Sequence, residues 1–282
     1  MALNLLMTHT NNETIVQIIL GRLRQEGDAI ATAWNKGRAA GSTAHFVVDD
    51  LLPPELAHEI YEAFPQDAHG FFIRNDFRER KKTLTDLSAS HPVLSAITYA
   101  LQDQRVISEI GDLTALAELQ PDPSLYAAGL SMMVKGDFLN PHIDNSHNRE
   151  RSLYRRLNLL YYVSPEWSTS NGGNFELWEP GVRRQEVVPA RFNRLLVMET
   201  TKTSWHSVDE VTVDAPRCCV STYVFSPSSD DGTAYFHVTS FLGRPGQTFR
   251  RAWGQIDNRL RQTVSTALKT GRGVKRINKT AP

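Results

Sequence analysis

Apolar and polar positions follow a helical period in the first part of this chain. Residues 13–37 place isoleucine, leucine, alanine and tryptophan at helical spacing, which predicts an amphipathic helix with a break near Gly27. A short strand is expected at 46–48, followed by a helix that begins at Pro54. Another helical region is expected over roughly 92–118. These segments predict helices that pack beside a main domain.

From residue 126 to residue 226 the pattern changes to short β-rich runs separated by turns. Six or more strands at this density predict a sandwich or barrel rather than alternating βαβ units. A last strand is expected at 234–241, followed by a turn and a helix at about 247–268. The predicted fold class is therefore mostly β with flanking helices.

The predicted elements divide the chain into three parts that form one compact unit. Residues 1–42 form an amino-terminal helical extension, and residues 43–240 form the β domain with its supporting helices. Residues 241–282 form a carboxyl-terminal helix and a tail whose last fourteen residues hold five basic and no acidic side chains. Such a tail is typical of a solvated segment and, less often, of a contact surface.

Charge and cysteine content restrict the function classes. The 31 basic residues balance the 31 acidic ones, so the net charge gives no reason to expect a nucleic-acid or membrane partner. The amino terminus has no leader pattern, and no window approaches 18 consecutive apolar residues. Cys218 and Cys219 are adjacent, a spacing that disfavours a disulfide between them and favours a reducing compartment. We therefore expect a cytoplasmic protein.

His142-Ile143-Asp144 is a candidate metal site. Side chains at positions i and i+2 of a strand point to the same face, so His142 and Asp144 could present an imidazole and a carboxylate together. His206, at a strand-like position further along the chain, is the candidate third ligand. Two histidines and one carboxylate leave other coordination positions open, which suits non-haem Fe(II), whereas a structural zinc site needs four protein ligands.

Iron chemistry of this kind needs a two-electron reductant, a role that 2-oxoglutarate fills while it chelates the metal. The distal carboxylate of 2-oxoglutarate then needs a partner. Arg217 stands eleven residues after His206, at the start of a strand on which Cys219, Ser221 and Tyr223 share its face. A guanidinium can hold a carboxylate through two parallel hydrogen bonds, and Ser221 could add a third.

The order and spacing of these motifs carry a family resemblance over about residues 130–227. The motifs are H-x-D, LNLLYYV, GGNFEL, RFNRLLVMET, a histidine and an arginine. The segment resembles the Fe(II)/2-oxoglutarate-dependent dioxygenases of the prolyl-4-hydroxylase-like group, including the hypoxia-sensing prolyl hydroxylases. The resemblance implies a double-stranded β-helix, or jelly roll, in which His142, Asp144 and His206 hold iron and Arg217 anchors the co-substrate. It also implies Fe(II), 2-oxoglutarate and O2, with ascorbate as a reductant.

The resemblance extends to the wall of the co-substrate pocket. In the hypoxia-sensing enzymes the second tyrosine of a Tyr-Tyr pair meets the distal carboxylate, and Tyr162 stands at that position. Strand periodicity places Asn158 and Leu160 on the same face. Met133 stands where many relatives have a tyrosine, which changes the polarity of the pocket. Halogenating relatives have glycine or alanine at the position of Asp144, so its carboxylate favours hydroxylation.

The polar loop after the H-x-D motif has two interpretations. Asn145, His147 and Asn148 could contact the substrate or simply form a solvated loop. Four arginines follow closely: Arg149, Arg151, Arg155 and Arg156. These side chains could meet an anionic substrate or form a solvated face.

Four functions remain open at this point. A small-molecule hydroxylase that acts on an amino acid, a sugar or a natural-product intermediate is favoured, because helices at both ends could enclose a pocket. The chain also shows no separate peptide-binding module. A protein hydroxylase of the prolyl type is the alternative, and a non-catalytic jelly-roll binding protein is a third. A zinc hydrolase is a fourth, although it leaves Arg217 and Tyr162 without a purpose. The sequence does not predict an oligomeric state.

Overall fold

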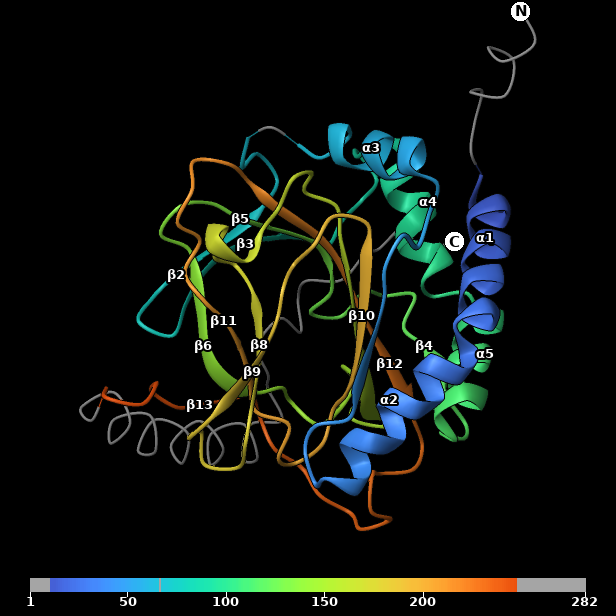
Figure 1. The fold of residues 1–282 in the computed structure, drawn as a ribbon, viewed down its shortest axis with the longest axis vertical. Coiled ribbons are helices and arrows are strands. Elements are labelled where there is room, and N and C mark those ends of the chain that lie inside the picture. Colours follow the sequence, from blue (N-terminus) through green and yellow to red (C-terminus); the bar gives the residue numbers. More distant parts are fainter. Residues whose placement is uncertain (1–10, 66, 248–282) are drawn as a thin grey trace, which may run out of the picture.

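The computed structural model describes residues 11–65 and 67–247. The helix expected at about 247–268, apart from residue 247, and the basic tail lie outside the described residues. Figure 1 shows a strongly curled antiparallel sheet with helices gathered on one side of it. The predicted fold class, mostly β with flanking helices and a jelly-roll core, is confirmed.

Five α-helices form within the described residues. They are α1 (Asn12–Gln25), α2 (Gly27–Ala39), α3 (Pro54–Glu62), α4 (Pro92–Ala100) and α5 (Gln104–Thr114). The predicted break near Gly27 separates α1 from α2. The helical region expected over roughly 92–118 forms two helices, because the Asp103 side chain accepts a hydrogen bond from the Arg105 backbone and caps the start of α5.

The described residues also form thirteen strands and a short 3-10 helix. The strands are β1 (His45–Val48), β2 (Phe72–Asn75), β3 (Glu79–Leu84), β4 (Gln120–Pro121), β5 (Gly129–Met133), β6 (Phe138–Ile143), β7 (Tyr154–Tyr162), β8 (Phe175–Trp178), β9 (Gln185–Val188), β10 (Arg194–Glu199), β11 (His206–Val208), β12 (Arg217–Ser226) and β13 (Ser240–Phe241). The 3-10 helix η1 is Thr169–Asn171. Main-chain pairing runs in the order β1-β10-β7-β12-β5-β3-β6-β11-β8-β9, and all pairs are antiparallel.

The pleat of the central strand β7 separates two hydrophobic cores. Leu159 and Tyr161 point toward the helices and join a core with the apolar face of α1, whereas Leu160 and Tyr162 point into the curled sheet. The fully buried Ile15 and Ile19 hold α1 in the first core. The inner core is smaller, and polar side chains complete its walls. None of the described helices is both long and apolar enough to cross a bilayer.

Two parts of the sequence-based interpretation are wrong in detail. Strands β2 and β3 were not expected, although they form a hairpin at the edge of the site described below. The strand expected at 234–241 is reduced to β13, which pairs with β6. The preceding residues do not pair as a strand, because the His237 carbonyl accepts a hydrogen bond from the Ser146 amide and the His237 amide donates to the Ser146 hydroxyl. The proposed division at residues 42 and 240 stays a prediction.

Candidate metal and co-substrate site

Strands β6 and β11 bring the three candidate metal ligands together. His142 and His206 are directly opposite each other in this antiparallel pair, so both imidazoles lie on the same face, with ring centroids 4.1 Å apart. Asp144 follows β6, and its carboxylate oxygens lie 3.7 Å from His142 Nε2 and 3.6 Å from His206 Nε2. All three ligand atoms lie within 4.8 Å of one another, close enough to share one metal ion.

Backbone carbonyls orient both imidazoles. His142 Nδ1 lies 3.0 Å from the Asn140 carbonyl oxygen, and His206 Nδ1 lies 2.9 Å from the Ser204 carbonyl oxygen. A carbonyl only accepts, so each Nδ1 carries the hydrogen and each Nε2 keeps a lone pair for a cation. Asp144 Oδ2 is buried and accepts no hydrogen bond from the described residues. This donor set fits a divalent ion of the non-haem iron type.

Burial keeps the two histidines neutral. It lowers the pKa of His142 to about 3, with a further contribution from His206, and it also lowers the pKa of His206. For Asp144, burial alone would raise the pKa, but Arg155 and the two imidazoles outweigh this effect and bring the pKa to about 2. At neutral pH the site therefore offers two neutral nitrogens and one carboxylate, which are the forms that bind a metal.

These protonation states predict that acid destabilises the metal-free protein. An unfolded His142 takes up a proton below about pH 6.5, whereas the folded residue does so only near a pKa of about 3. The unfolded state therefore binds more protons, and the free energy of unfolding should fall by about 2 kcal/mol between pH 7 and pH 5 for this residue alone. Urea denaturation of chelator-treated protein at both pH values measures the loss. His142→Asn should reduce it, and an unchanged loss in that variant would count against this interpretation.

Arg217 lies at the start of β12 and is buried inside the curled sheet. Its Nε donates to the Gly173 carbonyl oxygen at 2.5 Å, its Nη1 lies 3.7 Å from Met133 Sδ, and its guanidinium lies 4.8 Å from the Tyr162 ring centroid. No carboxylate among the described residues forms an ion pair with it. An unpaired buried guanidinium is costly, so this position fits an anionic ligand such as a dicarboxylate.

The double glycine before β8 makes room for Arg217. Gly172 and Gly173 have φ angles of +69° and +66°, a region that glycine enters without a steric penalty. A Cβ atom on Gly173 would lie 2.6 Å from Arg217 Cδ, and one on Gly172 would collide with the Glu210 carbonyl oxygen. The double glycine thus lets the backbone pack closely against the arginine behind it.

The other predicted pocket residues line the same inner face. The Tyr162 hydroxyl and the Asn158 side-chain oxygen are buried and make no hydrogen bond with the described residues. Burial raises the pKa of Tyr162, so its hydroxyl stays protonated and can donate. Leu160 lies between Asn158 and Tyr162 along β7, and Ser221 of β12 is its direct partner across the strand pair. Their roles in binding a co-substrate stay predictions.

The loop after Asp144 mostly packs against its own surroundings. His147 lies 4.4 Å from Tyr154 and 5.7 Å from Phe236, measured between ring centroids, and its Nδ1 lies 2.7 Å from the Ser146 hydroxyl. Of the four nearby arginines, only Arg155 lines the cleft described next. A structural role for His147 is therefore favoured over a substrate role.

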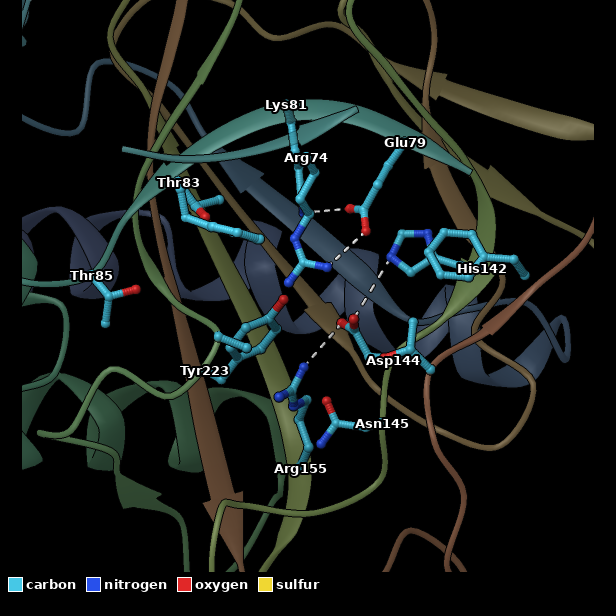
Figure 2. A pocket seen from close by; sticks show the side chains of 14 residues that line it. Arg74, Glu79, Lys81, Thr83, Thr85, His142, Asp144, Asn145, Arg155 and Tyr223 are labelled. Atoms are coloured by element: carbon cyan, nitrogen blue, oxygen red, sulfur yellow. Dashed lines mark hydrogen bonds and ion pairs between the residues drawn. The ribbon is translucent and has the colours of Figure 1, made fainter. Parts of the chain in front are cut away.

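Sequence reasoning missed the residues of a cleft on the open side of His142 and Asp144. Arg74 comes from β2, and Glu79 and Lys81 come from β3 (Figure 2). The cleft has a cavity volume of about 60 Å³. One signal was present in the sequence, an aspartate at position 76, since aspartate favours turns. In the structure its side chain accepts hydrogen bonds from the backbone amides of Arg78 and Glu79, an Asx turn that closes the hairpin.

Comparison with known proteins gives a family match over part of the chain. Residues 128–225 match the family described as the 2OG-Fe(II) oxygenase superfamily. A 73-residue segment is 37% identical to the prolyl 3-hydroxylase OGFOD1 of Xenopus laevis. That match covers 24% of this chain and 14% of the relative's length, so it concerns one part of a longer protein.

Solved structures of low sequence identity share the fold. A prolyl-4-hydroxylase of Pseudomonas putida is 14% identical, with 70% of this chain and 98% of that chain covered and a TM-score of 0.52. A prolyl 4-hydroxylase of Phytophthora capsici is 16% identical, with coverage of 88% and 75% and a TM-score of 0.53.

A prolyl hydroxylase of Trichoplax adhaerens, in complex with a peptide fragment of hypoxia inducible factor, is 15% identical, with coverage of 76% and 90% and a TM-score of 0.50. The resemblance found in the sequence is thus confirmed, and the family match implies its cofactor Fe(II) and co-substrates 2-oxoglutarate and O2. The family match thus covers residues 128–225, the part of the chain that holds the three candidate metal ligands and Arg217.

Proposed function

We propose that this protein is an Fe(II)- and 2-oxoglutarate-dependent hydroxylase in which His142, Asp144 and His206 hold the metal. The observation that carries the proposal is the convergence of two neutral Nε2 atoms and one carboxylate beside a cleft that His142 and Asp144 line. The bound iron and co-substrate supply the activation of O2. One oxygen atom enters a substrate C–H bond as hydroxyl, and the other enters succinate as 2-oxoglutarate loses CO2.

The protein's own part in this reaction is binding and orientation. Arg217 holds the distal carboxylate of 2-oxoglutarate, and the hydroxyls of Tyr162 and Ser221 add hydrogen bonds. Met133 lies opposite Arg217 in the β5–β12 pair and gives this wall a thioether instead of a phenol. Asn158 and Leu160 complete the wall. Because Asp144 keeps a carboxylate at the metal, hydroxylation is proposed rather than halogenation.

We propose a small molecule as the substrate, on the basis of cleft size. A volume of about 60 Å³ has room for about four to six water molecules. An amino acid or another small polar compound fits this space better than a large natural-product intermediate. No residue of the described helices lines the cleft, so the enclosure expected from the amino-terminal extension does not explain its size.

A protein hydroxylase is the second candidate, favoured by the outer surface of the β2–β3 hairpin. Ile73 is 55% exposed and Phe77 is 39% exposed, beside a cleft that could receive a single side chain. The relative solved with a peptide fragment of hypoxia inducible factor also supports this candidate. The cytoplasm is the compartment that we propose, because Cys218 and Cys219 are adjacent, buried and not in a disulfide.

Succinate formation tests the proposal. Protein loaded with Fe(II) without oxygen is given 2-oxoglutarate and then air, with separate pools of small molecules and of peptides. We expect succinate that increases with one pool and is absent with Asp144→Ala. If no pool gives turnover, binding of 2-oxoglutarate separates the hydroxylase from the other candidate functions. A metal-bound protein that does not bind 2-oxoglutarate would be a jelly-roll binding protein or a zinc hydrolase.

A further inference from the structure

Cationic side chains dominate the cleft beside His142 and Asp144. Arg74 and Lys81 extend into it from the β2–β3 hairpin, and Arg155 extends into it from β7 on the opposite side (Figure 2). The pairing of Arg74 with Lys81 across the hairpin places both side chains on the same face. Only two carboxylates, those of Glu79 and Asp144, are among the residues that line the cleft. The cleft therefore holds more cations than anions.

The two carboxylates are already in use. Glu79 is buried, and its oxygens lie 3.0 Å from Arg74 Nη1 and 3.5 Å from Lys81 Nζ, so one acid serves two cations. Asp144 is a proposed metal ligand, and a metal would take most of its charge. Once a divalent ion is bound, the positive excess in the cleft becomes larger.

Arg155 has hydrogen-bonding capacity that the protein does not use. Its side chain is 1% exposed, Nη1 lies 3.5 Å from Asp144 Oδ2, and the guanidinium carbon lies 3.6 Å from the Tyr223 ring centroid. Its Nε and Nη2 are buried and make no hydrogen bond with any described residue, and the same holds for Arg74 Nε. Unused donors on a buried guanidinium cost free energy, which an anionic ligand between the two arginines would recover.

We propose that the substrate presents a carboxylate to this cleft, held between Arg74 and Arg155 with additional attraction from Lys81. The inference rests on the proposed function. A carboxylate matches the planar donor pattern of arginine, and the small cavity places the C–H bond that reacts within a few bonds of that carboxylate. The carboxylate is not the distal one of 2-oxoglutarate, because neither Arg217 nor Tyr162 lines the cleft. A free organic acid or an acidic side chain of a peptide could supply it.

Paramagnetic relaxation by bound Mn(II) tests the proposal without knowledge of the substrate. Protein loaded with Mn(II) and saturated with 2-oxoglutarate is titrated with propionate, and in parallel with propionamide, its uncharged counterpart. We expect saturable relaxation of the propionate protons and at least tenfold weaker binding of propionamide. Arg74→Gln should weaken propionate binding at least tenfold, because glutamine can still bond to Glu79 but carries no charge.

The matched control is Arg80→Gln. Arg80 belongs to the same hairpin but is exposed and does not line the cleft. Arg155→Lys is the second cleft variant, which keeps the charge while it removes the planar donor pattern. If the relaxation of the propionate protons were the same in both cleft variants as in the wild type, propionate would be binding the metal directly, and the proposal would be overturned. Equal binding of propionate and propionamide would overturn it too. Relaxation of the 2-oxoglutarate protons in the same sample measures co-substrate binding. Its absence would contradict the proposed function, independently of the result with propionate.

A second arm identifies the source of the carboxylate. Free glutamate and a blocked Ala-Glu-Ala peptide are compared with glutamine and with the corresponding glutamine peptide. Preference for either acid over its amide supports the proposal, and the preferred acid shows whether a small molecule or a peptide supplies the group. Equal relaxation by each acid and its amide would overturn it.

Discussion

Alanine at His142 or His206 is expected to reduce succinate formation by more than about 100-fold, a larger loss than the 10- to 100-fold typical of residues that only support a metal ligand. Each substitution removes one of the three convergent side chains that we propose as metal ligands. The neighbouring side chains cannot replace it, because Phe241 stacks on His142 at 5.2 Å and Phe175 stacks on His206 at 5.4 Å. An aromatic ring offers no lone pair to the metal.

The measurement combines bound iron with succinate formation on the same protein samples. His58→Ala is the matched control, since His58 lies exposed on α3 against Phe192, with ring centroids 4.6 Å apart. We expect this variant to keep both iron and turnover. Full iron content and full turnover in His206→Ala would show that the triad is assigned wrongly.

The candidate metal triad could be predicted in part because two of its three residues are neighbours in the sequence. His142 and Asp144 are two residues apart, and strand periodicity alone puts their side chains on one face. His206 comes from a different strand, and its position opposite His142 depends on the β6–β11 register. Its strand-like position made it a candidate and the order of motifs in the family resemblance supported it, but the register across distant strands is not encoded in a local pattern.

The cleft could not be predicted because its hairpin does not look like a pair of strands. Seven of the twelve residues 72–83 are charged, and charged residues are poor indicators of strands. The hairpin forms because β3 pairs with β5 and β6, which lie far away in the sequence. Arg74 and Lys81 thus reach the candidate metal site through long-range pairing. The strand expected at 234–241 failed for the opposite reason, because a local β pattern was overridden by the contact of His237 with Ser146.

Arg217→Ala is expected to raise the apparent Michaelis constant for 2-oxoglutarate by about 100-fold, with a smaller effect on turnover at saturation. Two charge-assisted hydrogen bonds at about 1.5–3 kcal/mol each account for a change of this size or larger. The guanidinium is fixed for this task, because Gly173 accepts from Nε and leaves Nη1 and Nη2 free of any carboxylate among the described residues. Initial rates of succinate formation over a range of 2-oxoglutarate concentrations give both constants.

Two further variants separate loss of the anchor from general damage. Arg217→Lys keeps the charge but not the two parallel donors, so it should recover only part of the affinity for 2-oxoglutarate. Arg183→Ala removes an exposed arginine from the β8–β9 connection and should behave as the wild type. Tyr162 stays beside the vacated position, and its single hydroxyl cannot replace a cation, so affinity should not return without a positive charge. If 2-oxoglutarate bound Arg217→Ala as tightly as the wild type, the inner face of the sheet would not be the co-substrate site, and its unpaired polar groups would need another ligand.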